Sequence, residues 1–524
     1  MKVPLPSDVP STSRGNVGSF HQWKNNTHPK WWRDPGLRKN VGWAMTLYLG
    51  VFVFGYDANL MNGLQALPQW NEYFNHPTGL RLGLIVTSLM FPIIIFAPIA
   101  SWCLDKFGRK FAVSAGSFVL IVGPVISGLA QNESMLIAGR VLIGGSSCFT
   151  MIACSCLVNE LLHPRIRGVF SSLVVFAMMS GNIIGSWVTF ATLQWQSSWS
   201  WRFPLLLQVI CPVALFPLSL FCPESPRWLV KNGQREKAHD ILARYHANGD
   251  RDDELVKNEL DQIVTRIEKE EGEQASWRAL VSTPGNRRRT LLVVLTFTGS
   301  VTTGLTVVGS YMVPTLQLVG ITSPAQLSGV NGGYSVIVAI GCLTGAFCTD
   351  KLGRRPMYLI STSAMLVFFS VLTALMAVFS HSPLPSLAII YVVVLYLFVF
   401  ALNFSWSALV GLYPPEILPY SLRAKGIALG NFLLAICSSF NTFVIPIALE
   451  AIGWKYYTVY IGIIAVYLGL LWAFLIETKG RTIEETAELF DGSRSQYEPE
   501  KDIQGEGVMV SEPRCSSEIK IDAL

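Results

Sequence analysis

The amino-acid sequence predicts an all-α membrane protein with twelve transmembrane helices arranged in two six-helix bundles. Three observations support this prediction. The chain has 524 residues, of which 51% are hydrophobic and only 14% are charged, against roughly 25% charged in a typical soluble protein. The apolar residues form long continuous segments, and several motifs occur once in each half of the chain. These features exclude a soluble enzyme, a disordered chain and a small disulfide-rich secreted domain.

The charged residues are concentrated in three regions. Of 40 basic and 35 acidic residues, 53 lie in 1–40, 223–289 and 477–524, which leaves 22 for the other 369 residues. A stretch so poor in charge cannot present an ordinary water-facing surface, so we expect it to contact a lipid bilayer. The formal charge of +5 belongs to short membrane loops and does not indicate nucleic-acid binding.

Twelve apolar segments are long enough to cross a bilayer as helices, because about 20 residues span ~30 Å of hydrocarbon. They are too long and continuous to be the alternating strands of a membrane barrel. The twelve spans are expected at 41–62, 82–104, 111–129, 134–158, 169–193, 202–222, 290–313, 328–349, 356–379, 384–412, 422–448 and 454–476.

Basic residues in every second connection predict the orientation of the chain. Lys106, Arg165, Lys351 and their basic neighbours mark these loops, whereas the alternate loops contain few, with Lys455 the main exception. By the positive-inside rule, both termini and the long central loop are cytoplasmic. The expected organisation is an N-terminal tail 1–40, a bundle 41–222, a cytoplasmic linker 223–289 with short surface helices near 234–246 and 253–271, a bundle 290–476 and a C-terminal tail 477–524.

Internal repeats indicate a duplicated chain. Asp105-Lys-Phe-Gly-Arg-Lys110 follows the second span, and Asp350-Lys-Leu-Gly-Arg-Arg355 follows the eighth, 245 residues later. Glu160 precedes Arg167 by seven residues, and Glu416 precedes Arg423 by the same spacing, 256 residues later. Pro223-Glu-Ser-Pro-Arg227 after the sixth span is loosely repeated as Glu477-Thr-Lys-Gly-Arg481 after the twelfth.

Duplicated six-helix halves with a binding site between them are typical of alternating-access transporters. An acidic helix end facing arginines makes charge-assisted bonds that would close the cytoplasmic side and break on opening. The alternative, that the motifs are topology signals only, explains the arginines but not the two spaced glutamates. We assign to this cytoplasmic gate Asp105, Gly108, Arg109, Glu160, Arg167, Glu224, Arg227, Asp350, Gly353, Arg354, Glu416 and Arg423.

Taken together, these motifs resemble the sugar porter family of the major facilitator superfamily over nearly the whole chain. Gly55-Tyr56-Asp57, Gly139-Arg140, the two DKxGR loops, the PESPR segment and Glu477-Thr-Lys-Gly-Arg481 match its signatures. Finer features, among them Asn62-Gly-Leu-Gln65, Tyr73-Phe-Asn-His-Pro77 and Gly453-Trp-Lys-Tyr-Tyr457, are similar to its fungal lactose-permease-like branch. The resemblance implies the major facilitator fold and a carbohydrate substrate.

Two of the 22 remaining charges, Asp57 and Arg140, are not near the ends of their spans. A charge inside the membrane costs ~2.5–3.5 kcal/mol even on insertion scales, so it needs a partner. The first span runs outward and the fourth runs inward, and both residues lie ~8–9 Å below the outer surface at 1.5 Å per residue. Their depth therefore permits an ion pair.

A carboxylate with two environments can bind a proton on one side of the membrane and release it on the other. The family resemblance implies this coupling role for Asp57 and Arg140, so the proton is the expected coupling ion. The alternative is a purely structural ion pair. The sequence contains no P-loop, no HExxH motif and no plausible catalytic triad, so we expect neither ATP-driven transport nor an enzyme. No metal or other cofactor is expected.

The substrate pocket departs from the family pattern. The family usually has glutamine eight residues after the arginine that opens the fifth span, and this position is Val175. Its glutamine and asparagine positions in the seventh span align loosely with Thr302 and Thr306. In the tenth span, Gly411 occupies a common tryptophan position, and Val410 lies where the lactose-like branch often has glutamine.

Polar or aromatic residues remain at seven plausible midplane positions. A sugar hydroxyl is both donor and acceptor, so such residues are needed to satisfy it in a dry site. For each asparagine, helix–helix bonding is as reasonable as ligand contact. The candidate substrate contacts are Asn182, Asn331, Tyr334, Asn403, Trp406, Asn431 and Asn441.

The sequence thus predicts a monomeric plasma-membrane transporter that moves a sugar or sugar-like small solute by proton symport. A transporter, possibly an exporter, of a non-sugar metabolite is one alternative, because several hydrogen-bonding positions of the pocket are lost together. A non-transporting nutrient sensor is another, although the retained Asp57 and Arg140 argue against it.

Overall fold

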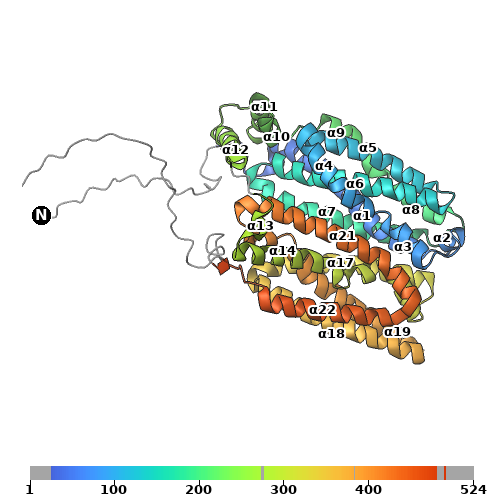
Figure 1. The fold of residues 1–524 in the computed structure, drawn as a ribbon. Coiled ribbons are helices and arrows are strands. Elements are labelled where there is room, and N and C mark those ends of the chain that lie inside the picture. The colour runs from blue at the N-terminus through green and yellow to red at the C-terminus, as the bar shows by residue number, and fades with distance from the viewer. Residues whose placement is uncertain (1–24, 273–275, 383, 481–488, 491–524) are drawn as a thin grey trace, which may run out of the picture.

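The protein is described from a computed structural model, which covers residues 25–272, 276–382, 384–480 and 489–490. Most of the predicted N-terminal tail and nearly all of the predicted C-terminal tail lie outside the described residues. The described part of the chain is helical and contains no β-strand. Its helices form two bundles that lie side by side, one built from α1–α9 and one from α14–α22 (Figure 1).

The first bundle contains the first six predicted spans. A short 3₁₀ turn, η2 (Trp31–Arg33), precedes it, and Asp34 caps α1 by accepting from Leu37 N at 2.9 Å. Its helices are α1 (Pro35–Gln65), α2 (Pro68–Tyr73), α3 (Gly79–Thr87), α4 (Phe91–Phe107), α5 (Arg109–Gly128), α6 (Glu133–Leu161), α7 (Pro164–Thr192), α8 (Trp199–Leu207) and α9 (Ile210–Phe221).

The second bundle repeats this plan after a linker. The linker helices are α10 (Pro226–Lys231), α11 (Arg235–His246), α12 (Glu254–Gly272) and α13 (Ala279–Ser282). The helices of the second bundle are α14 (Pro284–Thr302), α15 (Leu305–Ser310), α16 (Met312–Leu318), α17 (Pro324–Leu352), α18 (Arg354–His381), α19 (Pro385–Leu402), the π-helix η3 (Asn403–Ser407), α20 (Tyr413–Ile417), α21 (Tyr420–Ile452), the 3₁₀ turn η4 (Gly453–Lys455) and α22 (Tyr456–Phe474).

Eleven stretches of the described residues are long and apolar enough to cross a membrane. The last of them, Ser421–Phe474, has 54 residues, which as one helix would be about 81 Å long. A bilayer core is only ~30 Å thick, and Gly453 breaks this stretch with a positive φ of 56°. It therefore contains two spans, α21 and α22, and the predicted fold of twelve spans in two bundles is confirmed.

Three spans predicted as continuous helices are interrupted, the sixth by a turn at residues 208–209 between α8 and α9. The second consists of α3 and α4, with a turn at residues 88–90 directly before Pro92. The ring of Pro92 removes a backbone donor that a continuous helix would need. The seventh consists of α14 and α15, separated at Gly304, whose φ of 104° is accessible to glycine at little cost.

The linker helices lie at one end of the bundles, which we call the linker face, and α2 and α3 lie at the opposite end, the distal face (Figure 1). In the first bundle, α1 and α7 approach closely enough that a Cβ on Gly55 would lie 1.9 Å from Met178 O. A Cβ on Gly181 would likewise lie 2.1 Å from Phe52 O. Such close packing through small residues is typical of membrane helices and holds α1, which carries Asp57, rigidly against α7.

Candidate functional site

Asp57 on α1 and Arg140 on α6 face each other inside the first bundle. Asp57 Oδ1 lies 3.9 Å from Arg140 Nη1, and the two side chains are only 2% and 1% exposed. The Arg140 guanidinium is also held by α3, because its Nε donates to Ile85 O at 3.0 Å. The two charges that the sequence leaves unexplained are therefore neighbours, at the outer limit of an ion pair.

Neither carboxylate oxygen of Asp57 has a hydrogen-bond partner among the described residues, and the same holds for Arg140 Nη1. A buried carboxylate without donors is costly to keep ionised, and only the nearby guanidinium offsets that cost. The contact at 3.9 Å leaves the carboxyl group free to exchange one partner for another. This arrangement suits a group that gains and loses a proton.

Close to this pair, polar side chains of α1 bind the second bundle. Asn62 Nδ2 donates to Gly309 O at 2.6 Å and to Asn331 Oδ1 at 3.3 Å. Gln65 Nε2 donates to Ser310 O at 3.1 Å. These bonds connect α1 with α15 and α17, so they join the two halves of the chain.

A second group of bonds extends this contact. Asn59 Nδ2 donates to Ser335 Oγ at 2.8 Å, and it also bonds Ser186 on α7. Ser186 and Ser335 are themselves hydrogen-bonded. We call the set Asn59, Asn62, Gln65, Ser186, Gly309, Ser310, Asn331 and Ser335 the distal seal. Because it ties the halves together towards the distal face, the structure is closed on that side.

Two candidate substrate contacts, Asn331 and Tyr334, lie at this seal on α17. Asn331 is completely buried, and its Nδ2 has no partner among the described residues. The Tyr334 hydroxyl lies beside α15, where a Cβ on Gly309 would be 2.8 Å away from it. On the facing α7, Asn182 is partly exposed, and its buried Oδ1 likewise has no described partner.

Asn403 and Trp406 lie on the π-helix of the tenth span, inside the second bundle. Trp406 is completely buried, its Nε1 donates to Thr362 Oγ1 at 3.2 Å, and its ring meets Tyr358 and Tyr467 edge to face. Asn403 bonds within its own helix, to Val399 O at 2.9 Å and to Ser407 Oγ at 2.7 Å. In this structure both side chains make their hydrogen bonds within the second bundle. Ligand contact by either stays a prediction.

The remaining pocket positions differ in exposure. On α21, Asn431 is exposed, and Asn441 Nδ2 donates weakly to Val301 O on α14 at 3.5 Å. Val175, at the family's glutamine position, is 47% exposed. A Cβ on Gly411 would meet nothing within 4 Å. The structure therefore leaves room for larger side chains at Val175 and Gly411.

On the linker face, the duplicated motifs form two matching ion pairs. Arg109 Nε lies 3.1 Å from Glu160 Oε2 in the first bundle, and Arg354 Nη2 lies 2.7 Å from Glu416 Oε1 in the second. Asp105 and Asp350 are one turn before these arginines, at 3.7 Å and 3.4 Å, with exposed carboxylates. Each pair joins helices of the same bundle.

A second carboxylate completes each motif by capping a helix. Glu224 Oε1 accepts from Arg109 N at 3.0 Å at the start of α5, and Glu477 Oε1 accepts from Arg354 N at 2.9 Å at the start of α18. An anion at a helix N-terminus satisfies free N–H groups and the helix dipole. Burial raises the pKa of Glu224, against the lowering effect of the backbone N–H groups that it accepts from.

Gly108 and Gly353 make room for these carboxylates. Both have positive φ angles, 98° and 94°, directly before α5 and α18. A Cβ on Gly108 would lie 2.2 Å from Glu224 Oε2, and one on Gly353 would lie 2.9 Å from Glu477 Oε2. The glycine of each DKxGR motif is therefore required both by its backbone angle and by the approach of the cap.

Arg167 pairs with the linker and not with Glu160. Its Nη2 lies 3.0 Å from Glu259 Oε1 on α12, and the other oxygen of Glu259 lies 2.7 Å from His246 Nδ1 on α11. Burial raises the pKa of Glu259, but the charges of His246 and Arg167 and the bond from His246 outweigh it and lower that pKa to about 2. Burial and the neighbouring His246 lower the pKa of His163 to about 3.

The two other predicted gate residues are also partly buried. Burial and the charge of Arg266 lower the pKa of Arg227 on α10, although Glu160 and Glu259 oppose this shift. Arg423 lies in the first turn of α21, and its Nη2 approaches Leu418 O at 3.5 Å.

Several residues of these sites were not found from the sequence. Glu477 was detectable, because its motif loosely repeats the one that contains Glu224. Asn59, Asn62 and Gln65 share one side of a helix that also contains Asp57, but their partners in the second bundle lie more than 240 positions away. Glu259 lies in a linker rich in carboxylates, where no spacing marks it as the buried one.

The chain is similar to known proteins along most of its length. A profile of the sugar (and other) transporter family matches residues 43–490. A high-affinity glucose transporter 1 of Candida albicans is 26% identical over 465 residues, which cover 84% of this chain and 83% of the relative. The sugar transporter STL1 of Saccharomyces cerevisiae is 26% identical over 457 residues, covering 84% and 79%.

Solved structures show the same fold. The inward open conformation of the xylose transporter XylE from E. coli superimposes with a TM-score of 0.71 at 20% identity, covering 86% of this chain and 99% of that one. A proton:xylose symporter XylE bound to 6-bromo-6-deoxy-D-glucose gives 0.67 at 21% identity, with coverages of 86% and 99%. These relatives are named for glucose, xylose or sugars in general, so the narrower likeness to lactose permeases stays a prediction.

Proposed function

The chain belongs to the sugar (and other) transporter family of multi-pass membrane carriers, and we propose that it moves a sugar or sugar-like solute by proton-coupled alternating access. Members of such a family are transporters and not enzymes. The observation that carries the coupling proposal is the isolated, buried Asp57, 3.9 Å from Arg140 and without described hydrogen-bond donors. The proposal includes a plasma-membrane location, cytoplasmic termini and a monomeric protein.

The transport cycle follows from the two faces. The distal seal holds the halves together in this structure, and its hydrogen bonds must break for the distal face to open. On the linker face, the ion pairs of Arg109 and Arg354 each lie within one bundle, and as the proposed cytoplasmic gate they break when that face opens. When the distal face opens, water reaches Asp57. The relative stability of its protonated form and of its ionised form paired with Arg140 then changes. A proton and a solute that bind on one side are thereby released on the other.

The test is uptake by proteoliposomes with an imposed pH gradient. Asp57→Asn is expected to abolish uphill accumulation and to retain exchange of solute, because the amide cannot bind the coupling proton but still fits beside Arg140. The control is Glu72→Gln, which removes an exposed carboxylate on α2 and leaves accumulation unchanged. Accumulation by Asp57→Asn at the wild-type level would contradict proton coupling at this residue.

A second candidate function is transport, including export, of a less hydroxylated metabolite. It is favoured by Val175, because this exposed valine offers no hydrogen bond where sugar carriers of this family usually have glutamine. Val175→Gln is expected to raise sugar uptake at least several-fold if the native substrate is such a metabolite. Val169→Gln, an exposed change on the same helix, is the control. Wild-type sugar uptake that neither change alters would favour the sugar substrate. A sensor is distinguished from both by surface expression without transport of any solute.

A further inference from the structure

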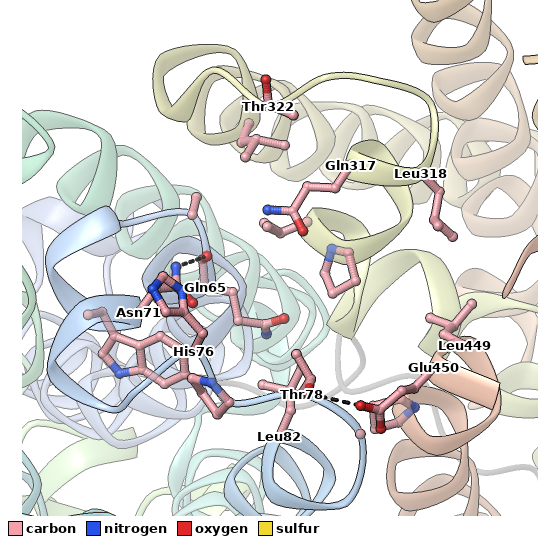
Figure 2. Close-up of a pocket in the computed structure, with 18 of the residues that line it drawn as sticks. Gln65, Asn71, His76, Thr78, Leu82, Gln317, Leu318, Thr322, Leu449 and Glu450 are labelled. Atoms are coloured by element: carbon pink, nitrogen blue, oxygen red, sulfur yellow. Dashed lines mark hydrogen bonds between the residues drawn. The ribbon is translucent and has the colours of Figure 1, made fainter. Parts of the chain in front are cut away.

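Two cavities at opposite ends of the molecule differ in the charge of their walls. The cavity at the distal face has a volume of about 440 Å³, and a hydrogen bond from Thr78 to Glu450 joins its two walls (Figure 2). None of the described residues that line it is a lysine or an arginine. The cavity at the linker face has a volume of about 650 Å³, and Lys110 and Lys237 both line it. We call this second cavity the linker groove.

The linker groove lies where the first bundle meets the linker helices. One wall comes from the end of α4, the start of α5 and the end of α9, and the other comes from α10 and α11. Trp228 on α10 connects the two walls, because its Nε1 donates to Asp105 O at 2.9 Å. The groove therefore borders the ends of membrane-spanning helices on one side and the linker on the other.

The positions of the lining residues along their helices show that both lysines face the groove. These residues are Lys110, Phe111 and Ser114 on α5, and Lys237, Asp240 and Ile241 on α11. Residues three or four positions apart lie on one side of a helix, so each set marks the side that faces the groove. Lys110 is partly exposed and Lys237 is exposed, so neither side chain is sealed inside the protein.

The two carboxylates that line the groove are engaged elsewhere. Glu224 accepts backbone N–H groups at the start of α5 through both of its oxygens, among them Lys110 N at 3.2 Å from Oε2. Asp240 forms an ion pair with Arg251. Among the described residues, no carboxylate pairs with the ammonium group of Lys110 or of Lys237. The groove thus offers two positive charges to a ligand that carries a negative one.

An apolar seam between α5 and α9 leads from the groove along the membrane-spanning surface. Phe111 and Leu220 line the groove, belong to membrane-spanning segments and are each 50% exposed. Phe118 lies two turns after Phe111 on the same side of α5, about 10 Å further along the helix axis. Its ring meets that of Phe216 on α9, one turn before Leu220, with 5.6 Å between the ring centroids. The apolar surface is therefore continuous from the lysines into the membrane.

This combination of charge and apolar surface fits one class of molecule. An anionic glycerophospholipid has a phosphate for the lysines and acyl chains for the seam, whereas a free phosphate leaves the seam unused and a neutral sugar leaves the lysines unpaired. With cytoplasmic termini, as proposed above, the linker face borders the leaflet that carries anionic lipids, and basic pockets between helices there bind lipid headgroups. We propose that the linker groove binds the headgroup of an anionic phospholipid, whose acyl chains follow α5 and α9.

A lipid in the linker groove connects the linker with the first bundle. Lys110 belongs to a membrane-spanning helix and Lys237 belongs to a linker helix, so a headgroup between them holds α11 against α5. A ligand that binds only the docked arrangement stabilises it. Bound lipid therefore increases the protection of the α11 amides against hydrogen exchange.

The experiment measures lipid binding to the purified full chain by native mass spectrometry. The probe is dioleoyl-phosphatidylserine. Dioleoyl-phosphatidylcholine has the same acyl chains without a net charge, and inorganic phosphate has the anion without acyl chains. Lys110→Gln and Lys237→Gln each remove one charge from the groove, and Lys237→Arg keeps it. Lys231→Gln is the matched control, because this exposed lysine of α10 does not line the groove.

The wild type and Lys231→Gln are expected to bind one molecule of phosphatidylserine more tightly than phosphatidylcholine. Lys110→Gln and Lys237→Gln each raise the Kd for phosphatidylserine about fivefold, the size expected for one lysine beside an anionic membrane surface, and Lys237→Arg does not. In the double variant the two lipids bind equally, and phosphatidylserine no longer increases the protection of α11. Because Lys237 is exposed, its variant tests the charge even if Lys110→Gln disturbs the fold.

Three results would overturn the lipid site. Equal affinity of the wild type for the two lipids would show an apolar contact that does not select charge. A rise in Kd of the same size in Lys231→Gln would show general attraction to a basic surface. Inorganic phosphate that binds as tightly as phosphatidylserine would show an anion site in which the acyl chains have no part. The assay measures no transport, so each result is independent of the proposed function.

Discussion

Glu477 accepts a hydrogen bond from the backbone N–H of Arg354 at 2.9 Å, across 123 positions of sequence. The same geometry joins Glu224 to Arg109 at 3.0 Å in the other bundle. In both bundles the last span is thus fastened to the start of the third by a carboxylate on a helix N-terminus. This relationship means that the acidic residue of each C-terminal motif stabilises its own bundle, whatever part it also takes in opening and closing.

Removal of the Glu477 carboxylate is expected to destabilise the second bundle. Glu477→Ala leaves the first N–H groups of α18 without their acceptor, and losing a helix cap typically costs ~0.5–2 kcal/mol. The midpoint of thermal unfolding in detergent should fall. Asp350→Ala is the control. That carboxylate lies 3.4 Å from Arg354, but it is 90% exposed and such a pair contributes little, so the unfolding midpoint of this variant should barely move. An equal fall of the unfolding midpoint in the two variants would show that the Glu477 cap contributes no more stability than an exposed ion pair.

Alanine substitution of the glycines before α5 and α18 should separate the effect of backbone strain from that of steric exclusion. Gly108→Ala combines a φ of 98° with a Cβ 2.2 Å from Glu224, whereas Gly353→Ala has a Cβ at 2.9 Å from Glu477. Gly233→Ala has a φ of 74° but meets nothing within 4 Å, so it carries strain alone, on the order of 1–2 kcal/mol. We expect thermal stability to fall in the order Gly233→Ala, Gly353→Ala, Gly108→Ala, the last being the worst. A Gly108→Ala protein as stable as Gly233→Ala would contradict the crowded cap.

Acid is expected to loosen the linker from the first bundle. The pKa of His163 is lowered to about 3 in the folded protein, so the stability that its neutral form contributes is complete above about 6.5 and is lost progressively as the pH falls towards 3. The pKa of Glu259 is lowered to about 2, and its contribution is lost only below about pH 4.5. The protection of the α11 and α12 amides, taken as the intrinsic exchange rate at each pH divided by the observed rate, should therefore be lower at pH 5.5 than at pH 7.5, mainly through His163.

His163→Asn is the matching variant for that pH dependence. Asparagine keeps an acceptor for Arg165 N, which His163 Nδ1 now binds at 3.1 Å, and it does not titrate. The protection of its α11 and α12 amides, relative to the intrinsic exchange rate at each pH, should change much less between the two pH values. If this variant and the wild type respond equally to acid, the sensitivity resides elsewhere in the linker.

Much of the architecture was predictable because membrane insertion imposes strong patterns. Segment length and the alternation of basic loops predicted the twelve spans, and the repeated motifs predicted that Arg109 and Arg354 would occupy equivalent positions. The equal depth of Asp57 and Arg140 permitted an ion pair, and a charge inside a bilayer needs a partner, which agrees with their separation of 3.9 Å.

Other features were not predictable because they depend on which side of a helix faces inward. The tenth span is apolar all round, so its sequence does not show that Trp406 packs into the second bundle beside Thr362. The interruptions at Gly304 and before Pro92 follow from local backbone chemistry, but a hydropathy window averages over them. Glu259 is buried only because His246 and Arg167, from two distant segments, meet it in space.

The linker is attached to the bundles in two separate parts. On one side, Asn248 after α11 bonds Asp34 at 2.9 Å, and His246 Nε2 lies 2.9 Å from Leu161 O. On the other side, Ala279 and Leu280 of α13 accept bonds from Asn286 and Thr290 of α14 at 2.9 Å and 2.8 Å. The two ends of the linker are thus fixed to different bundles, and each end should move with its own bundle. Fluorescent dyes attached to α11 and to α13 would report the distance between the two bundles as resonance energy transfer. This measurement follows the transport cycle in real time and leaves the permeation path unmodified.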